Sequence, residues 1–405
     1  MPTRRLLSPV ERKSYAVCIS FIILLILGFA AVIPFFWESK SLWYKTGSDK
    51  LLLQLGKDFG LFAAVLFLYQ IVLAQRLVIF DRIFGLDRLY SFHRINSFLI
   101  LGLAMLHAAL VVFPEGLDNL PIGWKFWPEL LGALLFIMLA SFIAIAFFRR
   151  KLLSYQLWRK IHRPAGYLLV VILSIHILYV SDSFEDGAPL VAFWVLVAAV
   201  LLTIVVARLY SVKMTLKQVP VASSRLVGED IVAMRVKVPS SFTYAPGQFA
   251  FLQLHGKEVA PEIHPFSIAS APGLSVKSAA TLEFFVKQCG DWTNSIQPGK
   301  EFQVSLTAPF GLFSYQARPL PPMLIYIAGG IGITPLLSML RQLCSEQNPP
   351  PLMLIWTLAQ KTDMFLAEEL GDLKARLSNL QTHIVYTREA GGRRLNKDAL
   401  RGGFC

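Results

Sequence analysis

The sequence predicts a membrane-embedded α-helical bundle of six transmembrane helices, followed by an antiparallel β-barrel and an α/β domain. Long apolar runs fill the first half of a chain whose residues are 55% apolar and whose mean hydropathy is +0.55. Strand-like alternation begins near Thr215, with Pro and Gly turns between the segments. Further on, an apolar strand, a glycine-rich turn and a helical pattern follow one another. We therefore expect three domains, at 1–212, 213–318 and 319–405.

Six apolar runs are long enough to cross a bilayer, because about 20 helical residues span its hydrocarbon core. No small-residue cleavage site follows the first run, so we interpret it as a retained helix and not as a signal peptide. The expected spans are 15–36, 59–80, 89–113, 128–148, 155–180 and 189–210.

The charges of the connecting segments predict the orientation of these spans. Segments 81–88 and 149–163 contain several arginines or lysines, whereas 181–188 contains none. The positive-inside rule then predicts a multi-pass protein of the cell inner (plasma) membrane with both termini in the cytoplasm. Segment 37–58, with four lysines, is an exception. Many cations behind the net charge of +13 flank apolar runs, and no basic patch is interleaved with aromatics, so we expect no nucleic-acid partner.

Two histidine pairs give the strongest functional signal. His93 and His107 lie in the third span and His162 and His176 in the fifth, fourteen residues apart in each case. Fourteen helical residues rise roughly 21 Å and make almost four turns, so both members of a pair share one helix face at two depths. Ionisable groups inside a membrane are costly and usually functional. We predict that the four histidines are iron ligands of two stacked b-type haems, with His93 and His162 at the inner haem and His107 and His176 at the outer haem.

Two motifs stand out in the barrel region. The first is His264-Pro265-Phe266-Ser267, which follows Pro246-Gly247-Gln248-Phe249. The second begins at Lys287 and continues to Gly290-Asp291-Trp292-Thr293. In the α/β region, the strand 324–329 leads into Gly329-Gly330-Ile331-Gly332, and a helical pattern then starts at Thr334-Pro335. A strand, a glycine-rich turn and a helix start form the layout that cradles the phosphates of a dinucleotide.

From about residue 59 onwards, these motifs together resemble the ferric reductase-like transmembrane flavocytochromes, which include prokaryotic NADPH oxidases. HPFSIAS is similar to the flavin-binding segment of their ferredoxin-reductase-like cytosolic module, and GDWT to the segment that holds the FAD pyrophosphate. Pro265 would fix an extended backbone beside the flavin, Ser267 would offer a hydroxyl, and Gly290 and Thr293 would admit and bind the pyrophosphate. The cofactor-binding residues that the resemblance implies are Gln248, Phe249, His264, Pro265, Phe266, Ser267, Lys287, Gly290 and Thr293 for FAD, and Gly329, Gly330, Gly332, Thr334 and Pro335 for NADPH or NADH.

The resemblance implies an enzyme of the NAD(P)H oxidase or ferric reductase type. A hydride would pass to FAD, and single electrons would then pass through the inner and outer haems to an external acceptor, without a catalytic acid–base residue. Because the segments between spans are short, we expect a small acceptor, foremost O2 giving superoxide. A ferric or cupric reductase is one alternative. A haem-binding membrane subunit that relays electrons without NAD(P)H activity is another, and the oligomeric state is left open.

Two departures from the family pattern leave questions at the nucleotide site. The Ser-x-Arg segment that binds the 2′-phosphate of NADPH has no counterpart in 355–361, where Lys361 is the available cation and Arg388 a second one further on. We favour NADPH and keep NADH as an alternative. The chain also ends at Phe404-Cys405 without the Cys-Gly-Pro segment and terminal aromatic residue of the family. We therefore expect a C-terminally incomplete nucleotide-binding domain, whose activity stays open.

Overall fold

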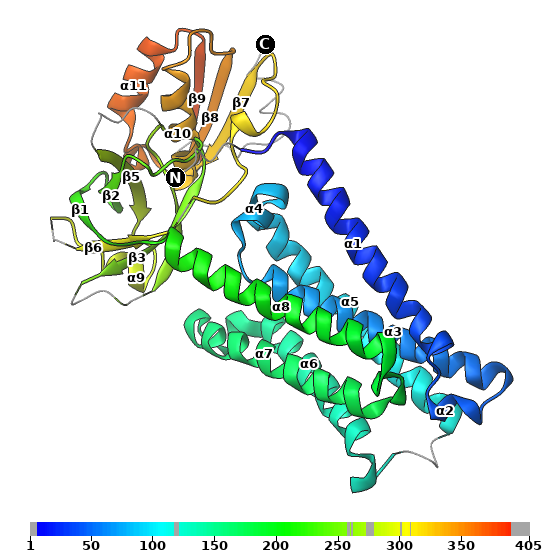
Figure 1. Cartoon of the computed structure of the whole chain (residues 1–405). Coiled ribbons are helices and arrows are strands. Elements are labelled where there is room, and N and C mark those ends of the chain that lie inside the picture. The colour runs from blue at the N-terminus through cyan, green and yellow to red at the C-terminus, as the bar shows by residue number, and fades with distance from the viewer. Residues whose placement is uncertain are drawn as a thin grey trace. The chain divides into compact units, whose positions relative to one another are not determined.

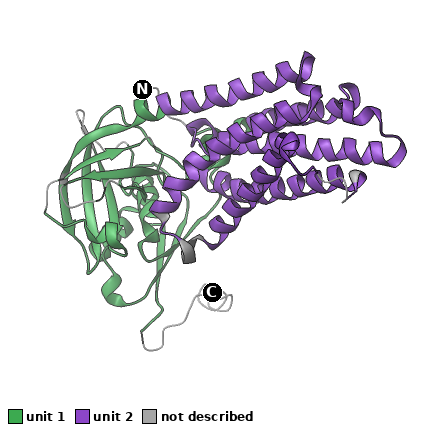
Figure 2. Cartoon of the chain, turned by 90° about the horizontal axis from the view of Figure 1, so that it is seen from below, with its two compact units in different colours: residues 1–13, 81–85, 210–405 green, residues 14–80, 86–209 purple. Residues whose placement is uncertain are grey.

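The computed structural model describes residues 6–116, 121–256, 260, 262–272, 279–299, 302–307 and 309–389, so the chain end at Phe404-Cys405 lies outside the described residues. The chain forms two compact units (Figure 2). One comprises Ser14–Phe80 and Leu86–Leu209, and the other comprises Met1–Lys13, Asp81–Gly85 and Tyr210–Cys405.

Long helices dominate the first half of the chain (Figure 1). Among the described residues, six helices are long and apolar enough to cross a membrane, which confirms the predicted six-helix bundle. These helices are α1 (Pro9–Phe36), α3 (Gly47–Leu73), α5 (Leu86–Val112), α6 (Trp127–Leu152), α7 (Tyr155–Val180) and α8 (Gly187–Met214). Shorter elements connect them: α2 (Lys40–Trp43), α4 (Val78–Phe84), η1 (Phe113–Glu115), η3 (Trp124–Phe126) and η4 (Asp182–Phe184).

The bundle is apolar both inside and outside, as a membrane requires. Phe67 and Ile71 of α3 pack with Ile100 of α5 and Leu169 of α7 in its core. Large apolar side chains such as Leu24 of α1 are exposed on the outer faces. Because lipid tails solvate such faces, we assign this bundle to the bilayer.

The second span differs from its predicted position. We expected 59–80, but α3 runs from Gly47 to Leu73 and the chain turns at Arg76, whose φ is +52°. Lys50 and Lys57 lie in the expected connecting segment 37–58, yet Lys50 Nζ lies 2.8 Å from Glu38 Oε1 and Lys57 Nζ donates to a serine hydroxyl. These partners satisfy polar side chains in the first turns of the helix, so the helix extends further toward the N-terminus.

The first part of the other unit is an antiparallel barrel. Its six-stranded sheet has the order β4-β3-β6-β1-β2-β5. After β4, the N–H of Ala269 donates to the carbonyl of Glu283 on β5 at 2.8 Å, so the sheet curls toward closure. We call residues 216–306 the barrel lobe. Its elements are β1 (Leu216–Leu226), β2 (Ile231–Pro239), β3 (Phe249–His255), β4 (Ile263–Ser267), β5 (Ala279–Lys287), α9 (Asp291–Asn294) and β6 (Gln303–Leu306).

The second part is an α/β arrangement, which we call the α/β lobe (residues 324–386). Its three strands are parallel in the order β7-β8-β9, with Ile327 opposite Ile355 and Ile355 opposite His383. Leu336 and Leu340 of the first helix pack with Trp356 of the central strand. After η5 (Tyr315–Ala317), the elements are β7 (Leu324–Gly329), η6 (Gly330–Ile333), α10 (Thr334–Leu343), β8 (Leu352–Leu358), η7 (Lys361–Asp363), α11 (Ala367–Arg376) and β9 (Leu380–Tyr386). The barrel and the α/β lobe thus confirm the predicted fold class.

Candidate functional site

The four membrane histidines form two pairs between α5 and α7, and the two rings of each pair are nearly perpendicular. The ring centroids of His93 and His162 lie 6.2 Å apart with an interplanar angle of 74°. Those of His107 and His176 lie 6.4 Å apart with an angle of 78°. In the part of the chain that the structure describes, no group of three or more His, Cys, Asp or Glu residues is suited to a metal ion, so each pair offers two protein ligands.

These separations and this donor set fit a haem bound on both faces. Two imidazoles that share one metal ion through nitrogen bonds of about 2.0–2.1 Å have ring centroids roughly 6 Å apart. Two protein ligands are too few for a bare structural zinc ion, which takes four. A haem instead needs only axial ligands from the protein. The geometry therefore suits two bis-histidine haem sites.

His107 and His176, which we predict to be the outer pair and call so below, are held in the tautomer that metal binding needs. Nδ1 of His107 lies 2.8 Å from the carbonyl oxygen of Gly56 on α3, and Nδ1 of His176 lies 2.8 Å from that of Pro128 on α6. A carbonyl oxygen only accepts hydrogen bonds, so each Nδ1 has the proton and donates it. The lone pair on each Nε2 stays free for a metal, and the carbonyl fixes the orientation of the ring.

Two glycines in contact with the outer pair were missed in the sequence analysis. An added Cβ at Gly60 would lie 2.7 Å from His107 Nδ1, and one at Gly132 would lie 2.5 Å from His176 Cε1. Each glycine follows the carbonyl acceptor of its own helix by four residues. The same arrangement of a carbonyl and a glycine against a histidine ring therefore occurs on α3 and on α6, and we call it the cradle. A glycine inside an apolar helix is a sequence signal for such a contact, because glycine lowers helix stability by about 1 kcal/mol relative to alanine.

His93 and His162, which we predict to be the inner pair and call so below, have different contacts. The indole of Trp158 stacks on the His162 ring at 4.6 Å and 30°. On α5, the backbone oxygen of His93 accepts a hydrogen bond from Gln70 Nε2 of α3 at 2.7 Å. Asn96 Nδ2, also on α5, donates to Gln70 Oε1 at 2.8 Å. Asn96 is only 1% exposed, so this polar chain between α3 and α5 is buried. It was not among the predicted site residues, although two amides inside apolar spans are a sequence signal for such a contact.

The two barrel motifs lie against each other. The ring of Trp292 lies 4.2 Å from that of His264 and 5.8 Å from that of Phe266, with an interplanar angle of 19° to the latter. Pro265 and Ser267 alternate with these residues along β4, and Pro265 is exposed. Because β4 is an edge strand, it tolerates a proline without a ladder N–H.

The Pro-Gly-Gln-Phe segment forms a tight turn before β3. Gly247 has a φ of +89°, and an added Cβ would lie 2.1 Å from a backbone oxygen, so only glycine fits there. Gln248 Oε1 accepts from the N–H of Ala245 at 2.8 Å, and its Nε2 donates to the carbonyl of Gly311 at 3.0 Å. Gln248 therefore holds the turn, while Phe249 pairs with Ser267 across the β3–β4 ladder.

The second barrel motif forms a capped turn. Thr293 Oγ1 accepts from the N–H of Gly290 at 3.0 Å. Gly290 is extended, and an added Cβ would meet nothing within 4 Å. The space beside Gly290 is therefore open, as the approach of a pyrophosphate requires. Lys287, at the end of β5, lies 3.1 Å from Asp230.

The glycine-rich segment forms the expected strand, turn and helix start. Gly329 ends β7, and Gly330 has a φ of +50°, a left-handed conformation that favours glycine. An added Cβ at Gly332 would meet nothing within 4 Å, so the space over the turn is open. Thr334 begins α10, and Pro335 occupies its first turn, where its missing N–H costs nothing. The turn lies at the carboxyl end of a parallel strand, where α/β folds bind ligands.

The two cations considered for the 2′-phosphate lie on neighbouring segments. Lys361 begins η7 after β8, and Arg388 follows β9. The N–H of Arg388 donates to the carbonyl of Ala359 at 2.9 Å, which joins these segments. Both side chains are exposed at the carboxyl edge of the sheet. Glu389 also accepts from the N–H of Lys361 at 2.7 Å, so the corner has a carboxylate as well.

Three family models match separate regions of the chain. Residues 59–175 match the ferric reductase like transmembrane component. Residues 216–306, which coincide with β1 to β6, match an FAD-binding domain. Residues 326–400 match the oxidoreductase NAD-binding domain. The order of the three regions is the architecture of the ferric reductase-like flavocytochromes.

Curated relatives resemble part of the chain. The reductase component of propane 2-monooxygenase from Mycolicibacterium goodii is 30% identical over 171 residues, which are 40% of this chain and 46% of that protein. Methane monooxygenase component C from Methylosinus trichosporium is 27% identical over 161 residues, 39% of this chain and 45% of that protein. The chain thus spans just under half the length of these relatives.

Solved structures also resemble part of the chain. A ferredoxin NADP+ reductase from Neisseria gonorrhoeae with bound FAD and NADP is 20% identical, with a TM-score of 0.39, and covers 47% of this chain and 77% of its own. The flavohem-like FAD/NAD binding domain of nitric oxide dioxygenase from Vibrio cholerae is 18% identical, with a TM-score of 0.38, and covers 45% of this chain and 82% of its own.

Proposed function

Because the chain has the domain architecture of the ferric reductase-like transmembrane flavocytochromes, we propose that it transfers electrons across a membrane from NAD(P)H. Electrons would pass from cytosolic NAD(P)H through FAD and two b-type haems to an external acceptor. The observation that most supports this path is the pair of bis-histidine sites, with ring separations of 6.2 and 6.4 Å. FAD-binding and NAD-binding domains on the same chain would deliver electrons to this path.

The four histidines have one role each in this proposal. His93 and His162 bind the inner haem iron, and His107 and His176 bind the outer one. When bound, each haem supplies a centre that accepts and gives one electron. The backbone carbonyls of Gly56 and Pro128 hold the rings of the outer pair.

The cytosolic residues bind and orient their cofactors. A hydride delivers two electrons whereas a haem passes one, and FAD supplies the conversion between them. Phe249, Pro265 and Ser267 would contact the flavin, and the open space at Gly290 would admit its pyrophosphate. The turn at Gly330, with its helix start, would hold the nucleotide phosphates. The remaining residues assigned from the resemblance keep their proposed cofactor-binding roles.

We propose O2, reduced to superoxide, as the acceptor, with NADPH as the donor. Support for a small acceptor comes from the short segments between spans. Fe(III) or Cu(II) is the alternative acceptor, and NADH the alternative donor. We also propose domain boundaries at 212/213 and 318/319, and each matched region falls within one of these domains. The proposed location is the inner (plasma) membrane, with both termini cytoplasmic.

The test is anaerobic addition of NADPH or NADH to detergent-purified protein loaded with FAD. The proposal predicts that the flavin bleaches and the haem bands then shift to the reduced form. A superoxide signal in air that disappears when superoxide dismutase is added would support the oxidase. Reduction of an Fe(III) chelate without superoxide would identify the reductase. Haems that stay oxidised with both nucleotides would favour a relay subunit and contradict the proposal.

A further inference from the structure

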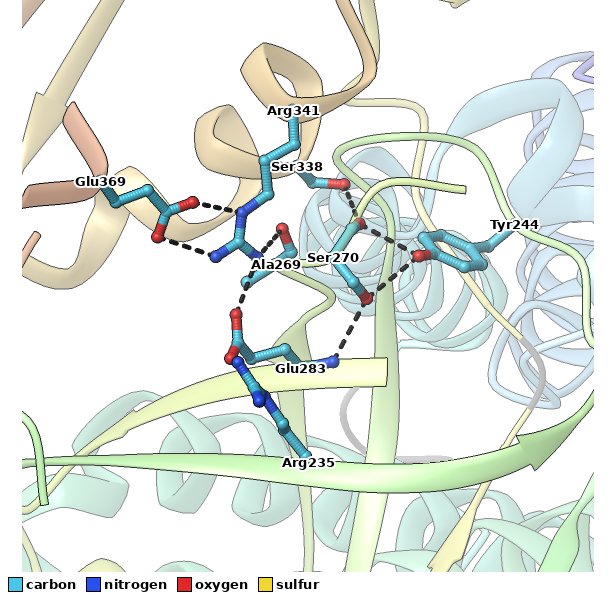
Figure 3. Close-up of polar contacts among 8 residues, drawn as sticks. All are labelled: Arg235, Tyr244, Ala269, Ser270, Glu283, Ser338, Arg341 and Glu369. Carbon is cyan, nitrogen blue, oxygen red and sulfur yellow. Dashed lines mark hydrogen bonds and ion pairs between the residues drawn. The ribbon is translucent and has the colours of Figure 1, made fainter. Parts of the chain in front are cut away.

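A buried arginine joins the two lobes of the cytosolic module (Figure 3). Arg341 on α10 donates from Nε and Nη2 to the carboxylate of Glu369 on α11, at 2.5 and 2.8 Å. Its Nη1 reaches the barrel lobe, where it lies 2.8 Å from Glu283 Oε2 and donates to the carbonyl of Ala269 at 2.9 Å. The side chains of Arg341 and Glu283 are only 17% and 8% exposed, so little water competes for these bonds.

A second bond joins α10 to the next residue of the same barrel segment. Ser338 Oγ donates to the carbonyl of Ser270 at 2.7 Å. The hydroxyl of Tyr244 lies 3.0 Å from the same oxygen (Figure 3). Ala269 and Ser270 are the last two residues of HPFSIAS, two and three positions after the end of β4. One helix of the α/β lobe therefore donates hydrogen bonds to two successive carbonyls of the proposed flavin segment.

The same helix begins at the proposed nucleotide site. α10 starts at Thr334, directly after the glycine-rich turn, and Ser338 and Arg341 lie about one and two turns further along. Ala269 also belongs to one apolar cluster with Leu337 and Leu340. A short, rigid element thus has the nucleotide turn at one end and the bonds to the flavin segment along its length.

Two donors of this cluster, Arg341 and Tyr244, have raised pKa values. Burial lowers the pKa of Arg341, but its bonds to Glu369 and the charges of Glu369 and Glu283 outweigh this and raise it above its ordinary value. Burial also raises the pKa of Tyr244 to about 12, so its hydroxyl stays protonated. Arg341 therefore stays charged and the hydroxyl of Tyr244 stays protonated at neutral pH.

We propose that Arg341 and Ser338 are positioning residues that set the nucleotide turn against the flavin segment for hydride transfer. In that step NAD(P)H is oxidised to NAD(P)+, and the hydride with its two electrons passes to FAD. The inference rests on the proposed function. Neither residue needs to touch a cofactor, because each acts through the backbone of Ala269 and Ser270.

Arg235 provides a matched control. Its Nε lies 3.0 Å from Glu283 Oε1, the other oxygen of the carboxylate that Arg341 binds. Arg235 belongs to β2 of the barrel lobe, so its bond stays within one lobe (Figure 3). Arg235→Ala therefore removes a cation from the same carboxylate without breaking a bond between the lobes.

The experiment compares Arg341→Ala, Ser338→Ala and Arg235→Ala in the full chain loaded with FAD. At saturating NADPH, we expect anaerobic flavin reduction to slow about tenfold or more in Arg341→Ala and severalfold in Ser338→Ala, because small misplacements of reacting groups cost large factors in rate. Arg235→Ala should stay within about twofold of the unsubstituted chain, and FAD affinity should be retained in all three. Ser338→Ala leaves every charge in place, so it tests the inference if Arg341→Ala fails to fold.

Amide hydrogen exchange on the FAD-free protein is the second readout. Segments 268–270 and 334–343 should exchange faster in Arg341→Ala and Ser338→Ala than in Arg235→Ala. Unchanged flavin reduction in both interlobe variants would overturn the inference. If neither nucleotide reduces the flavin of the unsubstituted chain, the proposed function fails, and the exchange result alone decides whether α10 holds the barrel segment.

Discussion

At the outer histidine pair, the ring of His176 leaves no room for a side chain at Gly132. His176 packs so closely on Gly132 that an added Cβ would lie 2.5 Å from its ring. Real Cβ atoms do not approach this closely, so the imidazole must move when the glycine is replaced.

Gly132→Ala should therefore lower the outer haem content, and haem per chain should fall from two toward one. The measurement is haem per protein in detergent-purified material. Gly102→Ala on α5 is the control, because its added Cβ would meet nothing within 4 Å. Two haems with an unchanged spectrum in Gly132→Ala would contradict the cradle.

Lys361 is the residue that we expect to distinguish NADPH from NADH. If Lys361 contacts the 2′-phosphate, Lys361→Ala should raise KM for NADPH by about tenfold and leave KM for NADH within about twofold, because charge-assisted bonds of this kind are worth roughly 1.5–3 kcal/mol at most. Lys374→Ala, an exposed position on α11, is the control. An equal change in both KM values would show that Lys361 does not read the phosphate.

At the element scale, α3 and α5 are joined by the buried chain of Asn96, Gln70 and the backbone of His93. Asn96→Leu removes the amide that Gln70 Oε1 accepts from and leaves that oxygen buried. We expect a loss of about 1–2 kcal/mol in stability, within the range seen for polar contacts between membrane helices. Thermal unfolding and the redox midpoint of the inner haem are the measurements.

Ser97→Leu on the same helix is the control, because the hydroxyl of Ser97 donates to the carbonyl of Arg94, one turn earlier on its own helix. Equal stability of the two variants, with an unchanged midpoint, would show that the Asn96 chain does not support the inner site.

The elements also show what the sequence can predict. The existence of six spans, the shared helix face of the two histidines within α5 and within α7, and the strand-turn-helix at Gly329 follow from local patterns, because periodicity and glycine spacing depend on neighbours in sequence. The start of α3 does not, since Lys50 and Lys57 find partners that lie far away in the chain. The same is true of Arg341, whose four bonds come from three separate segments. The roles assigned to the cofactor-binding residues remain predictions.

At the scale of the whole molecule, the order of the proposed electron path can be tested at its outer end. His107→Ala should remove the outer haem and stop electron delivery to the external acceptor, while NADPH still reduces FAD. Stopped-flow absorbance resolves the flavin and haem steps. If flavin reduction is lost together with the outer haem, the outer pair is not the last site of the path.

The central claim is that one chain holds two bis-histidine haems supplied by its own NAD(P)H-dependent flavin module. The most direct measurement is an absorption spectrum of detergent-purified protein with FAD, before and after anaerobic addition of NADPH, with haem and protein quantified. We predict two b-type haems per chain and a Soret band that shifts to the reduced position on NADPH addition. A chain purified without haem would contradict it.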